Sequence, residues 1–386
     1  MSALQYRRDI DGLRAIAVTL VILFHYQFPL FSGGFIGVDV FFVISGFLIT
    51  GLLLKVQSRD DFSFATFYSR RIRRLLPSFL LVSLVTFIVI SRYYMDDDYY
   101  IFSKSWLGSV IGLSNIFFHG ELSQYFSADA KIISLLHTWS LAVEEQFYFI
   151  WPLLLLLAKP IIRHAKFVLI FIGLWFGAFT FSIWHAIADP VAAYFLLPAR
   201  VFELMLGCGL ALFAHRLPIL NRWQAECLSL TGVVAIVASA ILLNSESIFP
   251  GYNALWPTAG AALIIYAGMS SHASLVTRLL STKAFVFLGT LSYSLYLWHW
   301  PPIALLNYQL VALTLPIKVG LISFAFFAAW FTHAFVENSL RYRQWSLRKT
   351  ISLLILLPCV LIWLVQLTIR TNDDISFRIP EEKRAL

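Results

Sequence analysis

Long apolar segments recur along the chain and restrict it to a membrane fold. Most are about 20 residues long, the length at which a helix crosses a bilayer. They lie near residues 12–30, 35–56, 77–94, 139–158, 167–186, 191–214, 227–243, 255–269, 289–311, 317–336 and 350–369. Because a bilayer offers no water to unpaired backbone groups, such segments cross it as helices. We therefore expect an all-α integral membrane protein, a polytopic bundle of about 11 transmembrane helices.

The composition agrees with this fold class and excludes several functions. Hydrophobic residues make up 59% of the 386 residues and charged residues 13%. In a membrane protein a net charge of +8 mainly reflects topology and contact with anionic lipid, so we expect membrane lipid and no nucleic acid among its partners. The cysteines Cys208, Cys227 and Cys359 show neither metal-binding spacing nor a disulfide framework, and we expect no metal site.

The distribution of basic residues predicts the orientation. If the segments alternate across the membrane, one set of loops receives most lysines and arginines. The opposite loops receive only Arg92, Lys104, Lys131 and Lys318 before the C-terminal tail. The positive-inside rule then places the N-terminus in the cytoplasm and the C-terminus outside. A shorter run at 101–118 is interrupted by polar residues and glycines, so we expect it to be interfacial or half-inserted.

The first apolar segment carries two ionisable residues, Arg14 and His25, eleven positions apart. On a helix this spacing returns to nearly the same face after a rise of roughly 16 Å, about half of the hydrocarbon core. Ionisable groups inside a membrane usually mark a functional path. The alternative is a histidine that only hydrogen-bonds a neighbouring helix.

A basic run, Arg70–Arg74, precedes the third apolar segment, and we expect Pro77 to occupy that helix's first turn. In a helix Arg70, Arg73 and Arg74 share a face, whereas Arg71 lies to one side. Arginine is suited to bidentate phosphate contact, which favours a phosphate-binding role. An ordinary cytoplasmic cluster that binds anionic lipid explains the pattern equally well.

Two carboxylates lie inside apolar segments, Asp39 near the start of the second and Glu144 near the start of the fourth. Together with His25 they are expected at one depth, about four to five residues below the outer surface. Such a layer suits a proton relay or a general base. The alternative is a buried polar network that locks helices together. Arg200 and Glu203, three positions apart, are expected to pair with each other.

The ninth apolar segment contains the aromatic stretch Ser292–Pro302, with Tyr293, Tyr296 and His299. Tyrosine and tryptophan usually gather at the membrane interface, but here they lie well inside the segment. They therefore either line a cavity or pack around a proline kink.

Several motifs together resemble the acyltransferase family 3 membrane proteins, which include bacterial O-antigen and peptidoglycan O-acetyltransferases. The resemblance covers roughly residues 6–340. It is carried by Asp9–Arg14, His25, Gly34–Thr50, Arg70–Pro77, Trp139–Tyr148 and Ser292–Pro301. It implies a core of ten spans in the bacterial inner membrane, with the eleventh helix as an addition.

The resemblance also implies transfer of an acetyl group from cytoplasmic acetyl-CoA to the hydroxyl of an extracytoplasmic polysaccharide or lipid-linked glycan. Acetyl-CoA is then a substrate, and no permanently bound cofactor is expected. The family's histidine, arginine and glutamate correspond to His25, Arg14 and Glu144. The candidate sites are catalytic His25, Asp39 and Glu144; donor-binding Arg14, Arg70, Arg71, Arg73 and Arg74; acceptor-binding Trp139, Ser140 and Tyr148; and cavity-lining Tyr293, Tyr296 and His299.

We expect three parts along the chain. Residues 1–340 form the transmembrane acyltransferase domain, and 341–370 form a linker with the extra helix. Residues 371–386 form a charged extracytoplasmic tail. In relatives with an eleventh helix, that helix delivers an SGNH-type domain, so such a domain, fused or separate, is an expected partner.

In the expected reaction His25 removes the proton from the sugar hydroxyl as it attacks the thioester, and Asp39 or Glu144 orients the imidazole. A relay through an acyl group held covalently on His25 or a serine stays open. The main alternative function is a proton-coupled exporter of a glycolipid or acidic substrate, although the inverted repeats typical of transporters are not evident. A structural anchor for an outer domain is a third alternative.

Overall fold

The computed structural model describes residues 6–57, 63–122, 125–162 and 164–371, and these residues form helices and connecting turns with no strand. The predicted tail 371–386 lies almost entirely outside the described residues. The chain divides into two compact units. Unit 1 comprises Met1–Phe62 and Val143–Ser292, and unit 2 comprises Ser63–Ala142 and Tyr293–Leu386. One boundary lies between Phe62 and Ser63, and the other two fall within α7 (Thr138–Ala158) and α14 (Lys283–Tyr308).

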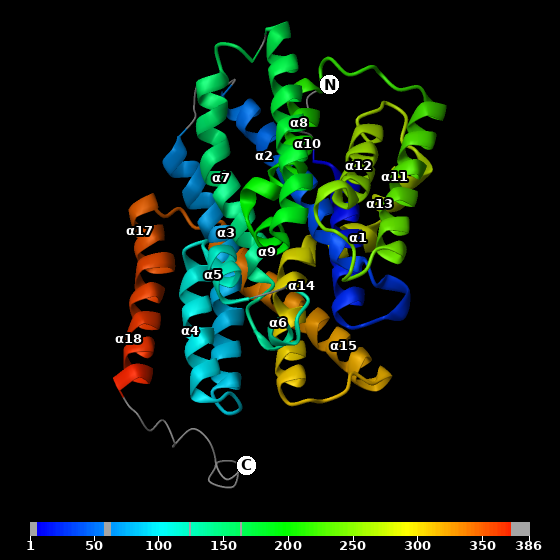
Figure 1. Ribbon diagram of the computed structural model, residues 1–386. Helices are drawn as coiled ribbons and strands as arrows, with labels where there is room; N and C mark the ends of the chain where they lie inside the picture. The colour runs from blue at the N-terminus through cyan, green and yellow to red at the C-terminus, as the bar shows by residue number, and fades with distance from the viewer. Residues whose placement is uncertain (1–5, 58–62, 123–124, 163, 372–386) are drawn as a thin grey trace. The chain divides into compact units, whose positions relative to one another are not determined.

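Each of the other helices belongs to one unit. Figure 1 shows the helices, coloured by residue number. Unit 1 holds α1 (Arg8–His25), η1 (Pro29–Phe31), η2 (Gly34–Ile36), α2 (Gly37–Gln57), α8 (Ala165–Ala188), α9 (Pro190–Phe195), α10 (Leu197–Phe213), α11 (Arg222–Leu242), α12 (Gly251–Ala267) and α13 (Leu275–Leu280). Unit 2 holds α3 (Phe64–Ile90), α4 (Asp96–Val110), α5 (Ser114–Glu121), α6 (Ala128–Ile132), α15 (Leu315–Phe331), the π-helical turn η3 (Thr332–Glu337), α16 (Asn338–Arg341), α17 (Leu347–Ile351), the π-helical turn η4 (Ser352–Leu356) and α18 (Leu357–Thr371).

The all-α polytopic fold is confirmed. Among the described residues eight helices are long and apolar enough to cross a membrane. They are Gly34–Val56, Phe64–Ile90, Thr138–Ala158, Lys166–Ala188, Pro190–Phe213, Arg222–Leu242, Leu315–Arg341 and Leu347–Ile369. The three other predicted spans form α1, α12 and α14. Of these, α1 carries Arg8, Asp9, Asp11 and Arg14, and α12 has only 17 residues. The count of eleven spans therefore stays a prediction.

In unit 1 glycine allows α2 and α10 to pack closely. A Cβ atom on Gly46 would overlap the backbone of Leu204, and one on Gly207 would overlap the backbone of Val43. Small residues at such a crossing let two membrane helices approach backbone to backbone. This contact holds the N-terminal halves of α2 and α10 side by side, which brings their buried polar residues together.

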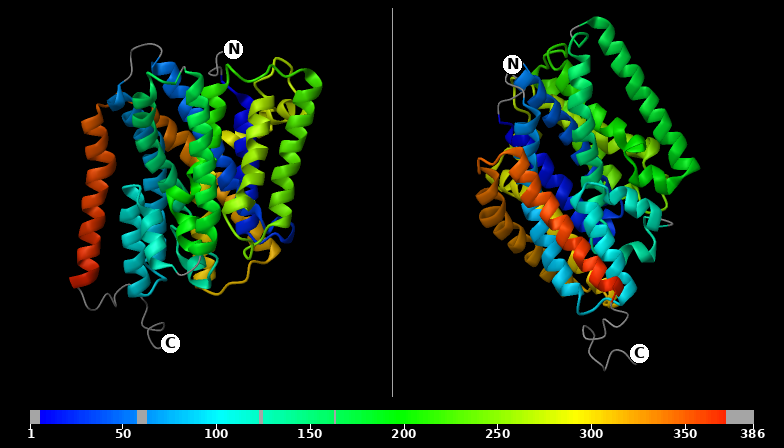
Figure 2. Two further views of the ribbon diagram at one scale, coloured as in Figure 1. Left: turned by 45° about the horizontal axis from the view of Figure 1, so that its top comes forward. Right: turned by 90° about the vertical axis from the view of Figure 1, so that its left-hand side faces the viewer.

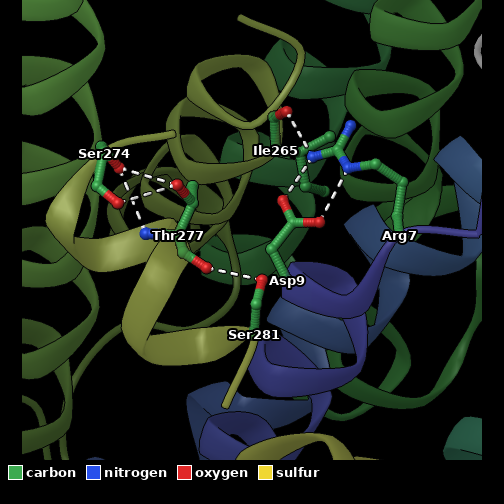
Figure 3. Close-up of polar contacts among 6 residues, drawn as sticks. All are labelled: Arg7, Asp9, Ile265, Ser274, Thr277 and Ser281. Carbon is green, nitrogen blue, oxygen red and sulfur yellow. Dashed lines mark hydrogen bonds and ion pairs between the residues drawn. The ribbon is translucent and has the colours of Figure 1, made fainter. Parts of the chain in front are cut away.

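The start of α1 is fixed to α12 by polar contacts (Figure 3). The Arg7 guanidinium donates to both oxygens of Asp9, at 2.8 and 2.6 Å, and to the carbonyl of Ile265 at 3.0 Å. Nearby, Ser274 caps α13 by accepting from the Thr277 amide at 3.1 Å. The Arg7 contacts set the position of α1, and therefore of Arg14, within unit 1.

In unit 2 the C-terminal helices pack on α3 and α4. Helix α17 contacts α3, and α18 lies along α4 (Figure 2). The Ser69 hydroxyl is 3.0 Å from the Thr350 hydroxyl, and Gln366 Nε2 donates to the Ser103 carbonyl at 2.9 Å. The extra helix is thus joined to the rest of unit 2 by side-chain hydrogen bonds as well as by apolar contact.

The expectation for Pro77 is wrong. Helix α3 begins at Phe64, where the Ser63 hydroxyl accepts from the Thr66 amide, so Pro77 lies inside the helix. Proline is tolerated inside membrane helices because neighbouring groups satisfy the backbone that it disturbs. Arg70–Arg74 lie in the first half of α3. The run is therefore helical, and Arg70, Arg73 and Arg74 share one face of the helix.

The run at 101–118 is not a single helix of spanning length, as expected. It divides between α4 and α5, and the break lies at Gly112, whose φ of 72° is in the left-handed region that favours glycine.

Candidate functional site

A buried cluster of three charged side chains joins α2 to α10 in unit 1. Arg200 NH2 lies 3.1 Å from Asp39 Oδ1, and Arg200 Nε lies 3.0 Å from Glu203 Oε1. The three side chains are 0–1% exposed. The predicted pair of Arg200 and Glu203 is confirmed, and Asp39 joins it from a distant part of the sequence. We call these residues the buried triad.

Aromatic rings enclose the guanidinium of Arg200. Its central carbon lies 5.4 Å from the ring centroid of Phe42, 5.7 Å from that of Tyr194 and 5.3 Å from that of Phe249. A cation is attracted to the face of such a ring, most strongly where water is excluded. The rings thus help to replace the water that Arg200 loses on burial, and they fix the guanidinium between the two carboxylates.

His25 is the last residue of α1 and is partly exposed. Its ring centroid lies 5.1 Å from that of Phe24, and Phe24 in turn packs edge-on against Phe35 at 5.3 Å. The helix ends five residues before the predicted end of the first segment, and Gln27 then adopts the left-handed region with φ 56°. His25 therefore lies at a helix terminus, where the chain turns toward α2.

Arg14 lies on the same helix, three turns before His25. Its NH1 atom is 3.6 Å from Asp11 Oδ1, and Asp11 also accepts from the Tyr6 hydroxyl at 2.7 Å. Because α1 is continuous from Arg8 to His25, the expected geometry holds: the two side chains share a face and are separated by a rise of roughly 16 Å.

Glu144 contacts a different part of α2 from the buried triad. It accepts hydrogen bonds from the Ser45 hydroxyl at 2.9 Å and from the Tyr148 hydroxyl at 3.0 Å. Ser45 lies about 9 Å further along α2 than Asp39. The first turn of α7 is buried, with Trp139 only 1% exposed, and the common depth of His25, Asp39 and Glu144 stays a prediction.

The arginine run of α3 lies in unit 2. Arg70 is exposed, Arg71 and Arg74 are partly buried, and Arg73 is buried. Arg73 NH1 donates to the Ser69 hydroxyl and to the carbonyl of Trp345, both at 2.8 Å. Both of these acceptors are neutral, so they leave the positive charge of Arg73 in place.

Ser140, Tyr296 and His299 form one buried network in unit 2. The Ser140 and Tyr296 hydroxyls are 2.7 Å apart, and the Tyr296 hydroxyl donates to the carbonyl of His137 at 2.9 Å. His299 Nδ1 lies 2.6 Å from the carbonyl of Tyr296, so Nδ1 carries the hydrogen. The imidazole of His137, which the sequence analysis did not assign, lies 5.7 Å from that of His299.

Two other predicted site residues make separate hydrogen bonds. The Tyr293 hydroxyl donates to the Leu75 carbonyl of α3 at 2.9 Å, and Tyr148 bonds Glu144 as described. The structure therefore brings together Ser140 with two of the predicted cavity-lining residues, Tyr296 and His299, and Tyr148 with a predicted catalytic residue. Within the described ranges, no three histidine, cysteine or acidic side chains are grouped so as to hold a metal ion.

Sequence reasoning missed the aromatic cage of the triad and the burial of His137. Arg200 was the available signal for the cage, because an arginine inside an apolar segment needs compensating partners. The rings themselves were not predictable, since Phe42 and Phe249 are distant in sequence from Arg200 and are selected by tertiary packing.

Comparisons with known proteins give a consistent result. A family model described as an acyltransferase domain matches residues 7–336. The chain is 34% identical over 314 residues to the peptidoglycan O-acetyltransferase OatA of Listeria monocytogenes, which covers 78% of this chain and 50% of that protein. It is 32% identical over 312 residues to the putative peptidoglycan O-acetyltransferase YrhL of Bacillus subtilis, covering 78% of this chain and 49% of the relative.

A third relative, the O-acetyltransferase OatA of Staphylococcus aureus, is 30% identical over 383 residues, which covers 93% of this chain and 63% of the relative. The chain thus spans about half the length of the first two relatives and under two thirds of the third. No solved structure matches.

Proposed function

The chain belongs to the acyltransferase family 3 of membrane proteins, and we propose that it moves an acetyl group from cytoplasmic acetyl-CoA to a hydroxyl of an extracytoplasmic sugar. The names of the relatives support an O-acetyltransferase acting on a surface glycan. The acceptor is either O-antigen or another lipopolysaccharide sugar, or a cell-wall glycan such as the peptidoglycan named for the relatives. Acetyl-CoA acts as a substrate, and no cofactor stays bound.

The observation that carries the proposal is the continuous helix α1 with Arg14 and His25 on one face. The rise of roughly 16 Å between them is comparable with the length that the extended pantetheine arm of the donor needs to cross. Charged phosphates held at the Arg14 end therefore leave the thioester near His25. A charged nucleotide does not have to enter the hydrocarbon in this arrangement.

The candidate donor-binding residues are Arg14 in unit 1 and the run Arg70–Arg74 on α3 in unit 2. Arg70, Arg71 and Arg74 supply planar guanidinium groups suited to bidentate phosphate contact. Arg73 adds positive charge and holds α3 against Trp345 through its two hydrogen bonds.

His25 acts as the general base. It accepts the proton of the sugar hydroxyl while the hydroxyl oxygen bonds the thioester carbon, and the carbon–sulfur bond then breaks to release the CoA thiolate. Glu144 or Asp39 stabilises the resulting imidazolium. Asp39 does so from the first turn of α2, where Arg200 fixes it. The candidate acceptor contacts are Trp139 and Ser140 in unit 2 and Tyr148 in unit 1, and the candidate cavity-lining residues are Tyr293, Tyr296 and His299 in unit 2.

The proposal includes an orientation and a partner. The N-terminus lies in the cytoplasm and the C-terminus in the periplasm, as the positive-inside rule predicts. In that orientation α18 leads outward, and an SGNH-type domain, fused or separate, is a partner on that side.

Sealed membrane vesicles test the proposal. Inside-out vesicles supplied externally with labelled acetyl-CoA should acetylate lumenal glycan, whereas sealed right-side-out vesicles should not. Parallel reactions with lipopolysaccharide and with peptidoglycan fragments identify the acceptor. Equal labelling in both orientations would refute the proposed sidedness. Movement of intact substrate without consumption of acetyl-CoA would favour the exporter.

A further inference from the structure

The described part of unit 2 contains a pocket of about 280 Å³ outside the residues assigned above. It is formed where the turn after α3, the first turns of α4, the end of α5, α6 and the end of α14 meet. Its polar lining consists of Tyr94, Asp98, Glu121, Asp129, Ser134 and Tyr308.

Two tyrosines form a rigid wall of the pocket. The rings of Tyr94 and Tyr308 stack with centroids 4.2 Å apart. The Tyr94 hydroxyl is 2.7 Å from the Ser134 hydroxyl, and the Tyr308 hydroxyl donates to Asp98 Oδ2 at 2.7 Å. The Met95 amide in turn donates to the Tyr308 hydroxyl at 3.0 Å. Because its side chains are already fixed, this wall loses little conformational entropy when a ligand binds.

The charge of the pocket restricts its ligand. Asp98, Glu121 and Asp129 supply three carboxylates, and no lysine, arginine or histidine lines the pocket. In the residues that the structure covers, none of the three carboxylates has a basic nitrogen within 4.0 Å. The pocket therefore offers hydrogen-bond acceptors and repels anions. A suitable ligand carries hydroxyl donors and no acidic group.

The pocket lies at the opposite end of α3 from the arginine run. Arg74 and the helix end at Ile90 are separated by about 24 Å of helix, and Tyr94 follows Ile90 in the next turn. If the arginines face the cytoplasm, the pocket faces the outer side, where the acceptor is.

We propose that this pocket binds one neutral sugar residue of the acceptor glycan. The inference rests on the proposed function for its orientation and for the role of the sugar. Sugar hydroxyls donate to the carboxylates in charge-assisted hydrogen bonds, and the apolar face of the ring packs against Ile101 and Phe102. The volume is at the lower limit of small-molecule pockets, about 300 Å³, which fits a single ring. The pocket thus selects neutral over acidic acceptor sugars.

Ligand binding to the purified protein without acetyl-CoA is the first test. Saturation-transfer NMR with the methyl glycosides of glucose, galactose, mannose and N-acetylglucosamine should detect at least one ligand, and methyl glucuronide should bind at least tenfold more weakly. Glu121→Gln and Asp98→Asn should each weaken that binding at least fivefold. Asp97→Asn is the matched control, because Asp97 lies in the same acidic run but does not line the pocket.

Three results would overturn the proposal. The first is that methyl glucuronide binds as tightly as the neutral glycosides. The second is that methyl glucosaminide or Ca²⁺ binds but no neutral glycoside does. The third is that the Asp98→Asn and Asp97→Asn proteins bind the neutral glycoside equally well. Glu121 is exposed, so its variant stays informative even if Asp98→Asn does not fold.

Kinetics then separate this proposal from the proposed function. Glu121→Gln should raise the KM for a neutral acceptor at least fivefold and leave the KM for acetyl-CoA unchanged. If the wild-type protein transfers no acetyl group but still binds neutral glycosides in the manner described, the acetyltransferase proposal fails and the sugar site stands. Unchanged acceptor KM in an active Glu121→Gln protein would overturn the acceptor role.

Discussion

Arg200 in unit 1 and Arg73 in unit 2 are both buried arginines on membrane helices, but their partners differ. Arg200 lies between two carboxylates and is enclosed by three aromatic rings. Arg73 donates to a hydroxyl and a carbonyl, and it stands in a run of four arginines. Within the chain, Arg200 is compensated by negative charge, whereas the acceptors of Arg73 leave its charge uncompensated.

The comparison shows how a structural charge can be distinguished from one that is available to a ligand. A buried guanidinium with carboxylates on two sides joins helices and has little positive potential left. A guanidinium held by neutral oxygens keeps its positive electrostatic potential, which adds to that of neighbouring arginines. The type of residue is the same in both places, so the partners decide the role.

Removing Arg200 should have the largest effect on stability. Arg200→Met leaves Asp39 and Glu203 buried without a countercharge, a change that typically costs about 3–5 kcal/mol. Thermal unfolding in detergent should show a large fall in the melting temperature or no folded protein. The triple variant with Asp39→Asn and Glu203→Gln added should recover much of the loss, because it removes the uncompensated charges. A single Arg200→Met protein as stable as the wild type would contradict the structural role of the triad.

Replacing His25 should affect activity without affecting stability, in contrast to Arg200. Loss of a general base costs about 10²–10⁴ in rate. His25→Gln should therefore lose acetyl transfer by that factor while its melting temperature and membrane insertion stay unchanged. His272→Gln is the matched control, since His272 is exposed in a loop. Near-normal transfer by a well-folded His25→Gln protein would exclude the proposed role.

Lysine substitutions test whether the arginine run binds the donor, because lysine keeps the positive charge but cannot make bidentate contacts with phosphate. Arg70→Lys, Arg71→Lys and Arg74→Lys should each raise the KM for acetyl-CoA by about tenfold, equivalent to ~1.4 kcal/mol of binding. Arg222→Lys, an exposed arginine at the start of α11, is the control and should not change it. If all four proteins saturate at the same acetyl-CoA concentration, the run is only a lipid and topology signal.

The sequence predicted what depends on local geometry. The pair of Arg200 and Glu203 follows from a spacing of three on a helix, and the shared face of Arg14 and His25 follows from a spacing of eleven. The partners of Asp39, Glu144 and Arg73 could not be predicted in this way. They lie 161, 99 and 272 positions away, at Arg200, Ser45 and Trp345, and only tertiary packing brings them together.

Pro77 shows the same limit for a helix boundary, and Trp139 shows it for the burial of a helix end. Proline at the first turn is a sound local rule, but the cap at Ser63 and the continued helix to Pro77 take precedence over it. An apolar segment was assumed to start at a membrane surface, although the start of α7 is enclosed by other helices. Pattern alone does not reveal which helix ends are covered by protein.

The smallest expected effect concerns the attachment of α17 to α3, which holds the segment that Arg73 contacts. The hydroxyl of Thr350 lies 3.0 Å from that of Ser69, and Ser69 also accepts from Arg73. Thr350→Val keeps the shape and removes this hydrogen bond, so unfolding free energy should fall by about 1 kcal/mol. Thr368→Val is the control, because the Thr368 hydroxyl bonds the Leu364 carbonyl of its own helix. Since Arg73 keeps its bond to the Trp345 carbonyl, the KM for acetyl-CoA should stay within about twofold of the wild-type value, a free-energy change of under ~0.5 kcal/mol. A tenfold rise in that KM without loss of stability would instead show that α17 positions the arginine run for the donor. In that case the contacts of Arg73 would serve both the fold and donor binding.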